Sequence, residues 1–425
     1  MRTILPSILA LLLGAFLLML GAGLLGTVLG VRLAEAATPT LVSGAVLAAY
    51  FAGLLLGSMR AASIVRGVGH IRAFAAFASL FSTAALAHGL TLDPWLWGVL
   101  RFVEGFCLAG LFMGIESWLN ARAENRFRGQ VLSLYMVTIY LAQGLGQLLL
   151  TLPDPTRFLL YVVASMLLSV SLVPVALTRF PAPELPDVRA FGFRALYAIS
   201  PFGVLGAAAS GVMLGAFYGM GPVFAQNIGL DTAGVARFMT AAIIGGLVLQ
   251  FPLGRLSDRF DRRTVMVGVV AGLAVVGCAT AAAPSFGPVV LLCAIALFGG
   301  LCFALYPLSV AHANDHVEAA DMVAASSGLL LAYGVGATFG PLAGSAAMHV
   351  LGPTGLFLFM ASIGALATGF GLWRMRVRPP LPPEAQAPFQ VVPRTSPVSV
   401  ELDPRAEPQP PETDREPPPD RRDAA

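Results

Sequence analysis

Three ionisable side chains and one amide stand in the largely apolar stretch from Trp95 to Asn120: Arg101, Glu104, Glu116 and Asn120. Ionisable groups in such a stretch are costly and usually face a partner or a wet cavity. A carboxylate there can bind and release a proton, and an arginine one turn away can interact with it. We therefore expect Glu104 or Glu116 to exchange a proton, with Arg101 acting on the nearer carboxylate. The alternative is a structural ion pair plus a glutamate at a helix end.

The spacing of these residues predicts one helical face. Steps of three and four residues separate Arg101, Gly105, Ala109, Phe112, Glu116 and Asn120, and such steps stay on one side of a helix. A rise of about 1.5 Å per residue puts Glu104 near the middle of the segment and Glu116 near its end.

A second group of polar side chains lies in two further apolar segments. Its members are Tyr135, Tyr140, Gln143, Gln147 and Tyr333. They can line a cavity, or they can simply hydrogen-bond neighbouring helices together. The sequence leaves both interpretations open.

Two proline motifs predict interrupted helices. Gly219-Met220-Gly221-Pro222 follows Tyr218, and Pro307 follows Tyr306. Carbonyl groups released at such a break are tolerated beside a wet cavity. Tyr218 and Tyr306 are therefore expected along a substrate or proton pathway.

The remaining reactive residue types do not form a catalytic or metal site. His312 and His316 are four residues apart and could bind a metal, but polar residues are expected at the predicted helix end where they lie. The cysteines all fall in apolar stretches and are expected as small core residues. The chain has no lysine, which excludes the G-K-[ST] phosphate loop. No enzyme activity, metal or cofactor is expected.

Composition identifies the environment of these residues. The chain of 425 residues is 57% hydrophobic and 12% charged, whereas soluble domains are about 25% charged. A net charge of +3 gives no reason to expect nucleic acid as a partner. Membrane-spanning helices need about 20 apolar residues. Spans are predicted at 4–31, 41–59, 71–91, 95–119, 130–151, 158–178, 198–225, 235–254, 264–284, 288–311, 322–350 and 354–373.

The spans divide into two halves of six. We expect an all-α membrane protein with one six-helix bundle at 1–178, a cytoplasmic loop at 179–197 and a second bundle at 198–375. The Pro-rich segment 376–425 has little apolar surface and is expected to be a disordered cytoplasmic tail. Met19-Leu20-Gly21-Ala22 recurs as Met213-Leu214-Gly215-Ala216 in the first span of each half, as expected for parallel repeats.

Arginines gather on one side of this predicted topology. The N-terminus and the loops on that side carry Arg2, Arg60, Arg66, Arg72, Arg122, Arg126, Arg128, Arg179, Arg189, Arg194, Arg255, Arg259, Arg262, Arg263, Arg374, Arg376 and Arg378, whereas the opposite loops carry Arg32, Arg157 and Arg237. Positive charge favours the cytoplasmic side. Both termini are therefore expected in the cytoplasm, with the protein in a bacterial inner membrane.

Gly254-Arg255-Leu256-Ser257-Asp258-Arg259-Phe260-Asp261-Arg262-Arg263 resembles the signature loop of the major facilitator superfamily, G-x-x-x-D-R-x-G-R-R/K. Arg101-Phe102-Val103-Glu104-Gly105 is similar to the R-x-x-x-G pattern of that superfamily's fourth span. A resemblance to its YcaD-like subgroup rests on Gly69-His70-Ile71-Arg72, Glu116-Ser117-Trp118-Leu119-Asn120 and Ala216-Phe217-Tyr218-Gly219.

The resemblance implies a conformational latch at Gly254, Asp258, Arg259, Arg262 and Arg263. Two departures stand out in the first half, where Ala62 and Arg66 replace the expected glycine and acidic residue. Asp261 also replaces a glycine in the second half. A first-half latch is therefore in doubt.

These features predict a secondary active transporter of a small solute that works by alternating access, with protons as a possible coupling ion. The alternative is a non-transporting membrane sensor or scaffold that retains the fold. The expected partners are the lipid bilayer and a small-molecule substrate, and the chain is expected to act as a monomer. Fold analogy names no substrate.

Overall fold

In the computed structural model, twelve helical spans are long and apolar enough to cross a membrane. The structure describes residues 5–123, 127–154, 158–177, 183, 192–318, 321–377, 386–396 and 398–399. Most of the predicted loop 179–197 and much of the predicted tail lie outside these residues. Within them every long element is a helix, and the twelve spans confirm the predicted fold class.

The first six spans are built from seven helices, and a short helix precedes the second six. The first set is α1 (Leu5–Glu35), α2 (Thr40–Val68), α3 (His70–Ala87), α4 (Pro94–Arg122), α5 (Arg128–Leu148), and α6 (Leu159–Val170) with α7 (Leu172–Ala176). The second set is α8 (Phe193–Ile199), α9 (Pro201–Asn227), α10 (Thr232–Arg259), α11 (Arg262–Ala282), α12 (Pro288–Asn314), α13 (Met322–Leu351) and α14 (Gly355–Val377).

Local sequence signals explain where several spans begin and turn. Asp93 caps α4 by accepting a hydrogen bond from the Trp95 amide at 2.8 Å, and Pro94 occupies the first turn. Asp231 caps α10 in the same way, through the Gly234 amide at 2.7 Å. Gly69 sits between α2 and α3 with φ +88°, a conformation that glycine adopts without steric cost.

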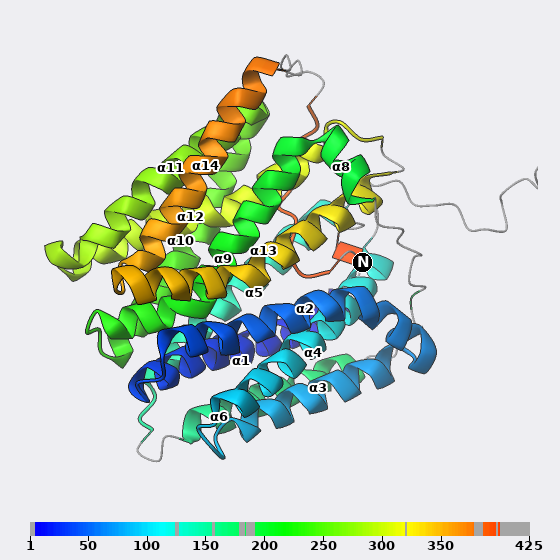
Figure 1. Ribbon diagram of the computed structural model, residues 1–425. Coiled ribbons are helices and arrows are strands. Elements are labelled where there is room, and N and C mark those ends of the chain that lie inside the picture. Colours follow the sequence, from blue (N-terminus) through cyan, green and yellow to red (C-terminus); the bar gives the residue numbers. More distant parts are fainter. Residues whose placement is uncertain are drawn as a thin grey trace, which may run out of the picture.

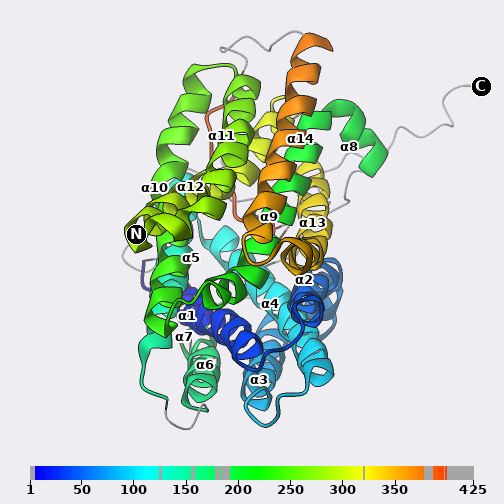
Figure 2. The ribbon, with the colours of Figure 1, turned by 60° about the vertical axis from the view of Figure 1, so that its left-hand side comes forward.

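The helices form two bundles that meet along the middle of the molecule (Figure 1). The first-half helices, blue to cyan, lie together below the green-to-orange helices of the second half, and Figure 2 shows the same division after rotation. Packing across the junction joins α2 to α13, α5 to α10 and α1 to α9. Each bundle therefore contributes one wall of the central space.

Glycines bring the two bundles close together at one face. A Cβ on Gly44, near the start of α2, would lie 2.5 Å from the Ser345 Cβ and 2.9 Å from the Pro341 carbonyl oxygen of α13. A Cβ on Gly30 of α1 would lie 2.9 Å from the Cβ of Pro222 on α9. We call the face at these contacts the closed face. The opposite face carries the arginine-rich loops and is called the arginine face.

The two predicted helix interruptions are absent. α9 continues through Pro222 to Asn227, and α12 continues through Pro307 to Asn314. A proline removes only one hydrogen-bond donor, and neighbouring helices can compensate inside a membrane protein. The expectation of broken helices at these motifs was wrong.

Part of the C-terminal tail is packed inside the molecule. Residues 386–396, 398 and 399, which we call the tail segment, lie between the bundles on the arginine face; they form the orange-red, mostly irregular segment in Figure 1. Val392, Val398 and Ser399 are buried. This packing differs from the disorder that the tail's composition predicts, because the buried surface is supplied by the bundles.

Candidate functional site

A central cavity of about 140 Å³ lies between the two bundles. Its polar and aromatic lining includes Thr27, Tyr50, Arg101, Tyr140, Gln143, Gln147, Tyr218, Tyr333, Arg394 and Thr395. Helices of both halves and the tail segment therefore contribute to one space. Residues that sequence reasoning selected meet there, among them Arg101, Tyr140, Gln143, Gln147, Tyr218 and Tyr333.

A buried ionic cluster stands at one wall of the cavity. The Arg101 guanidinium donates to Glu104 at 2.8 Å, and its Cζ lies 4.1 Å from the centre of the Tyr50 ring. The other Glu104 oxygen lies 3.2 Å from Nδ1 of His88, whose ring also contacts the Ala84 carbonyl oxygen at 2.8 Å. The Glu104 and His88 side chains are both fully buried. Arg101 therefore faces the cavity with its charge largely compensated.

The expected polar face of α4 divides between two environments. Arg101 and Phe112 line the cavity, but Gly105 packs on the backbone of α2, where a Cβ would lie 2.8 Å from the Leu54 nitrogen. Ala109 contributes to the same contact through Gly57. Asn120, close to the end of α4, does not line the cavity. Residues with the same helical spacing thus have two different surroundings: some pack against α2, and others face the cavity.

Hydrogen bonds across the bundle junction hold the amide side chains. The Tyr218 hydroxyl of α9 donates to Oε1 of Gln143 on α5 at 3.1 Å. Gln250 of α10 donates to the Tyr140 hydroxyl and to the Phe303 carbonyl, both at 3.1 Å. These contacts connect residues that lie at least 53 positions apart in the chain.

Gln147 anchors α5 to α1 within the first bundle. Its Nε2 donates to the Gly23 carbonyl at 3.1 Å, and its Oε1 accepts a hydrogen bond from the Thr27 hydroxyl. Gln147 is almost completely buried, so both interpretations of this residue hold together: it lines the cavity and it bonds two helices.

Glu116 lies apart from the cavity, beneath the tail segment. It accepts hydrogen bonds from the hydroxyls of Tyr135, at 2.8 Å, and of Thr395 and Ser396. The residue is fully buried, and among the described residues no arginine or histidine forms an ion pair with it. Its partners are therefore neutral hydroxyl donors, two of which belong to the tail.

The predicted latch loop also contacts the tail segment. Arg262 donates to Asp315 at 2.6 Å and to the Ala387 carbonyl at 2.7 Å, and its second nitrogen lies 3.5 Å from Asp258. Asp258 accepts from the Phe389 amide at 2.7 Å. Gly254 faces the Phe389 ring so closely that a Cβ would overlap it.

The other two latch arginines differ in burial. Arg263 is buried and its Nε lies 3.5 Å from Asp261, whereas Arg259, at the end of α10, is exposed. The aspartate that replaces the usual glycine thus caps α11 through the Arg263 amide at 3.2 Å.

Several residues of the site escaped sequence reasoning. Tyr50 lines the cavity, and Phe303 flanks it; a lone aromatic in an aliphatic span was the available signal. His88, at the C-terminal end of α3, contacts Glu104 and is a further residue of the cluster. Tyr306, which was selected, packs edge to face against Tyr333 with the ring centres 5.2 Å apart, but it does not line the cavity.

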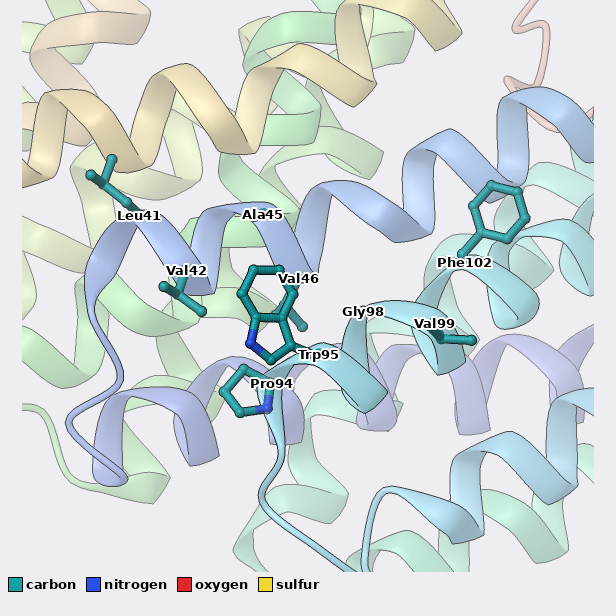
Figure 3. A pocket seen from close by; sticks show the side chains of 9 residues that line it. All are labelled: Leu41, Val42, Ala45, Val46, Pro94, Trp95, Gly98, Val99 and Phe102. Carbon is teal, nitrogen blue, oxygen red and sulfur yellow. The ribbon is translucent and has the colours of Figure 1, made fainter.

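A larger apolar recess lies outside this site. It has a volume of about 520 Å³ and is formed by the first turns of α2 and α4, including Leu41, Val42, Trp95 and Val99 (Figure 3). Trp95 is 81% exposed and Val99 is 61% exposed, on a span whose surroundings are lipid. The recess has no ionisable lining residue and belongs to the lipid-facing surface.

This geometry is that of a multi-pass membrane transporter, and comparisons with known proteins agree. The chain is 13% identical to a crystal structure titled nucleoside transporter NupG, with a TM-score of 0.75 over 88% of this chain and 100% of that one. It is 14% identical to a D-xylose-proton symporter, with a TM-score of 0.64 over 87% of this chain and 97% of that one. At these identities the likeness establishes the fold.

Sequence relatives establish the family. The profile of the Major Facilitator Superfamily matches residues 202–406. An uncharacterized MFS-type transporter of Enterobacter sp. (strain 638) is 30% identical over 85% of this chain and 94% of its own length. The uncharacterized MFS-type transporter YcaD of Salmonella typhimurium is 29% identical over the same shares. The chain belongs to the major facilitator superfamily, and its relatives confirm the predicted YcaD-like subgroup.

Proposed function

We propose that the protein is a secondary active transporter that moves a small solute by alternating access. The observation that carries the proposal is the central cavity, whose walls come from both bundles while glycine contacts close one face. Rocking of one bundle against the other would open that face and close the arginine face.

The absence of lysine excludes a Walker A loop, so the energy source is an ion gradient or the solute's own gradient.

We place the arginine face in the cytoplasm of a bacterial cell, with both termini on that side and the chain acting as a monomer. Positive charge on short loops sets this orientation. Phe260 is 57% exposed in the loop between α10 and α11. An impermeant thiol reagent should therefore fail to label Phe260→Cys in intact cells and should label it after permeabilisation. Labelling from outside would reverse the assignment.

Protons are the coupling ion in this proposal. Glu116 is the residue best suited to exchange them, because it is a fully buried carboxylate whose described partners are hydroxyls. Arg101, held in place by Glu104, supplies a polar wall to the solute pathway together with Gln143, Gln147, Tyr218 and Tyr333, while Tyr306 supports Tyr333. Asn120 is assigned to the pathway's cytoplasmic end. Gly254, Asp258, Arg259, Arg262 and Arg263 form the latch.

Transport is tested with protein reconstituted in liposomes. Solutes that raise the melting temperature of the purified protein identify ligands, because a ligand that binds only the folded form stabilises it. Counterflow of such a ligand supports transport. If no ligand that stabilises the protein exchanges across the membrane, the transport proposal fails.

Movement of the bundles can be tested without a known solute. Glu35 of α1 and Thr232 of α10 line the same recess on the closed face, which makes them suitable positions for spin labels. Gly44→Ala inserts a methyl group against Ser345, so it should shift the distance distribution toward a more open face. Gly98→Ala is the matched control, because no atom lies within 4 Å of its Cβ position. An unchanged distribution in both variants would contradict alternating access.

One observation favours a second candidate function. The tail segment fills the arginine face of the junction, and Ala62 and Arg66 depart from the first-half signature loop. A non-transporting sensor or scaffold that keeps the fold would have these features. Such a protein would bind a ligand in the melting assay and show no counterflow, which separates it from the transporter.

A further inference from the structure

The side chain of Arg394 enters the central cavity from the tail segment. Its guanidinium carbon lies 4.9 Å from the ring centre of Phe303, 5.9 Å from that of Tyr333 and 6.0 Å from that of Tyr140. One guanidinium nitrogen donates to the Tyr140 hydroxyl at 3.0 Å. Within about 6 Å, the electron-rich face of an aromatic ring attracts a cation. Three rings from both bundles therefore surround one positive charge.

Aromatic rings and a hydroxyl take the place of an acidic partner at this position. Among the described residues, no carboxylate lies within ion-pair distance of Arg394, and the lining of the cavity includes neither aspartate nor glutamate. The other cation on the wall, Arg101, is already paired with Glu104 at 2.8 Å. The cavity therefore accommodates a second positive charge through ring faces and a single neutral acceptor.

The tail segment is held in place by contacts on both sides of Arg394. Thr395 and Ser396 donate to Glu116, and the backbone at Ala387 and Phe389 bonds to Asp315, Arg262 and Asp258. These contacts lie toward the arginine face, so they position the guanidinium in the cavity without filling the cavity themselves. Arg394 thus occupies the place that a solute would take.

We propose that the central cavity is a binding site for an organic monocation, with a guanidinium or alkylammonium group as the recognised chemistry. Arg394 is its tethered internal ligand and competes with that cation for the rings of Phe303, Tyr333 and Tyr140. This inference rests on the proposed function, because it takes the cavity as the solute's site. A tethered group acts at a high local concentration, so the free cation binds weakly while the tail is in place.

The test removes the guanidinium group of Arg394 from the full-length protein and then offers a guanidinium compound in solution. Arg394→Ala removes the guanidinium, and N-acetylarginine amide supplies it in solution. Its neutral counterpart, N-acetylcitrulline amide, has nearly the same shape without the charge. Calorimetry on purified protein should show N-acetylarginine amide binding to the variant with a Kd at least about tenfold lower than to the unaltered protein, because the internal competitor is gone. The citrulline compound should show no such gain.

Two further variants control this measurement. Arg376→Ala removes one positive charge from an exposed position at the end of α14 and should bind the probe as the unaltered protein does. Phe303→Leu, added to Arg394→Ala, keeps an apolar side chain but removes a ring face. It should raise the Kd of N-acetylarginine amide about tenfold while the melting temperature shows that the protein is folded.

Three results would overturn the cation site. One is equal binding of the arginine and citrulline compounds to Arg394→Ala, since the cavity would not select charge. The second is no binding of either compound to that folded variant. The third is binding of sulfate to the unaltered protein that disappears in Arg394→Ala, which would make Arg394 part of an anion site.

Counterflow separates this inference from the proposed function. Charge-selective binding to Arg394→Ala without counterflow of the probe would leave the cation site standing and contradict transport of that cation. Counterflow of a neutral solute by a protein that shows no charge-selective binding would support transport and overturn the cation site.

Discussion

Glu104 and Glu116 are both fully buried on α4, twelve positions apart, yet they differ in every partner. Glu104 pairs with Arg101, one turn earlier on the same helix, and lies beside His88 at the end of α3. Glu116 is bonded by hydroxyls from α5 and from the tail segment. Glu104 is neutralised by the charge of a nearby arginine, whereas Glu116 receives two of its hydrogen bonds from a segment nearly 280 residues away in the chain.

In the function that we propose, this difference separates a structural carboxylate, Glu104, from one that takes part in transport, Glu116. A buried ion pair that loses one partner leaves an uncompensated charge, so Arg101 and Glu104 are tied to each other. The hydroxyl partners of Glu116 can bond to either its ionised or its neutral form, since a hydroxyl both donates and accepts. Only Glu116 is therefore suited to change charge when the tail segment moves.

The largest expected effect follows from neutralising Glu104. Glu104→Gln leaves the Arg101 guanidinium, whose side chain is 7% exposed, without its counter-ion. Removing one partner of a buried pair costs about 3–5 kcal/mol, so the free energy of unfolding in detergent should fall by that order. Chemical denaturation monitored by tryptophan fluorescence measures the change.

Its matched control is Glu35→Gln. Glu35 contacts Arg32 at 3.2 Å with three-residue spacing, as Arg101 does Glu104, but its side chain is 29% exposed. A surface pair contributes about 0–1 kcal/mol. If the free energy of unfolding falls equally in Glu35→Gln and Glu104→Gln, burial does not make the Arg101–Glu104 pair more important for stability than the surface pair, which would contradict our interpretation.

An effect of intermediate size is expected from Gly254→Ala. By displacing the tail segment, this substitution should affect Glu116 but not the other carboxylate, Glu104. The added methyl group overlaps the Phe389 ring, and overpacking of this kind costs about 1–3 kcal/mol. The tail segment should leave its position, and trypsin should cleave after Arg394 about tenfold faster. The control is Gly268→Ala on α11, whose added Cβ meets no atom within 4 Å. Unchanged cleavage in Gly254→Ala would show that Phe389 does not secure the tail.

Sequence reasoning recovered the fold because its signals are local. Twelve apolar stretches and their charged ends identify the spans, and the structure confirms each of them. Parts of the site were also accessible, since a glutamine or tyrosine such as Gln143 or Tyr218 stands out in an apolar segment. Spacing along a helix does not tell which residues of one face point into the cavity: Gly105 shares the spacing of Arg101 but packs on α2.

The long-range partners were beyond the reach of a single sequence. His88 lies 16 positions before Glu104, and no spacing rule connects the end of one helix to the middle of the next. Arg394 stands in a Pro-rich stretch whose composition predicts disorder, yet its binding surface is provided by Tyr140, Phe303 and Tyr333 from three different helices. Such a contact depends on the folded cavity, not on the tail's own sequence.

A smaller effect on stability, with a specific effect on transport, is expected from Glu116→Gln. The amide keeps one oxygen to accept hydrogen bonds, so the free energy of unfolding should fall by only about 1 kcal/mol. Because glutamine cannot bind and release a proton, solute-driven proton movement in liposomes should disappear while counterflow continues. Proton movement that persists at the original rate would remove Glu116 from the coupling mechanism and assign it to packing.

The smallest effect is expected from Ser396→Ala, which removes one hydroxyl from Glu116 and leaves Tyr135 and Thr395 in place. Because two hydroxyl donors remain, the loss of unfolding free energy should lie at the low end, about 0.5 kcal/mol, of what a single hydrogen bond contributes. The same substitution in a Glu116→Gln background should cost less, since a bond to a charged acceptor is stronger than one to an amide. A double-mutant cycle on unfolding free energies measures the coupling. If the coupling is zero, Ser396 does not hold Glu116, and the tail's part in the contrast between the two carboxylates is left to Thr395 alone.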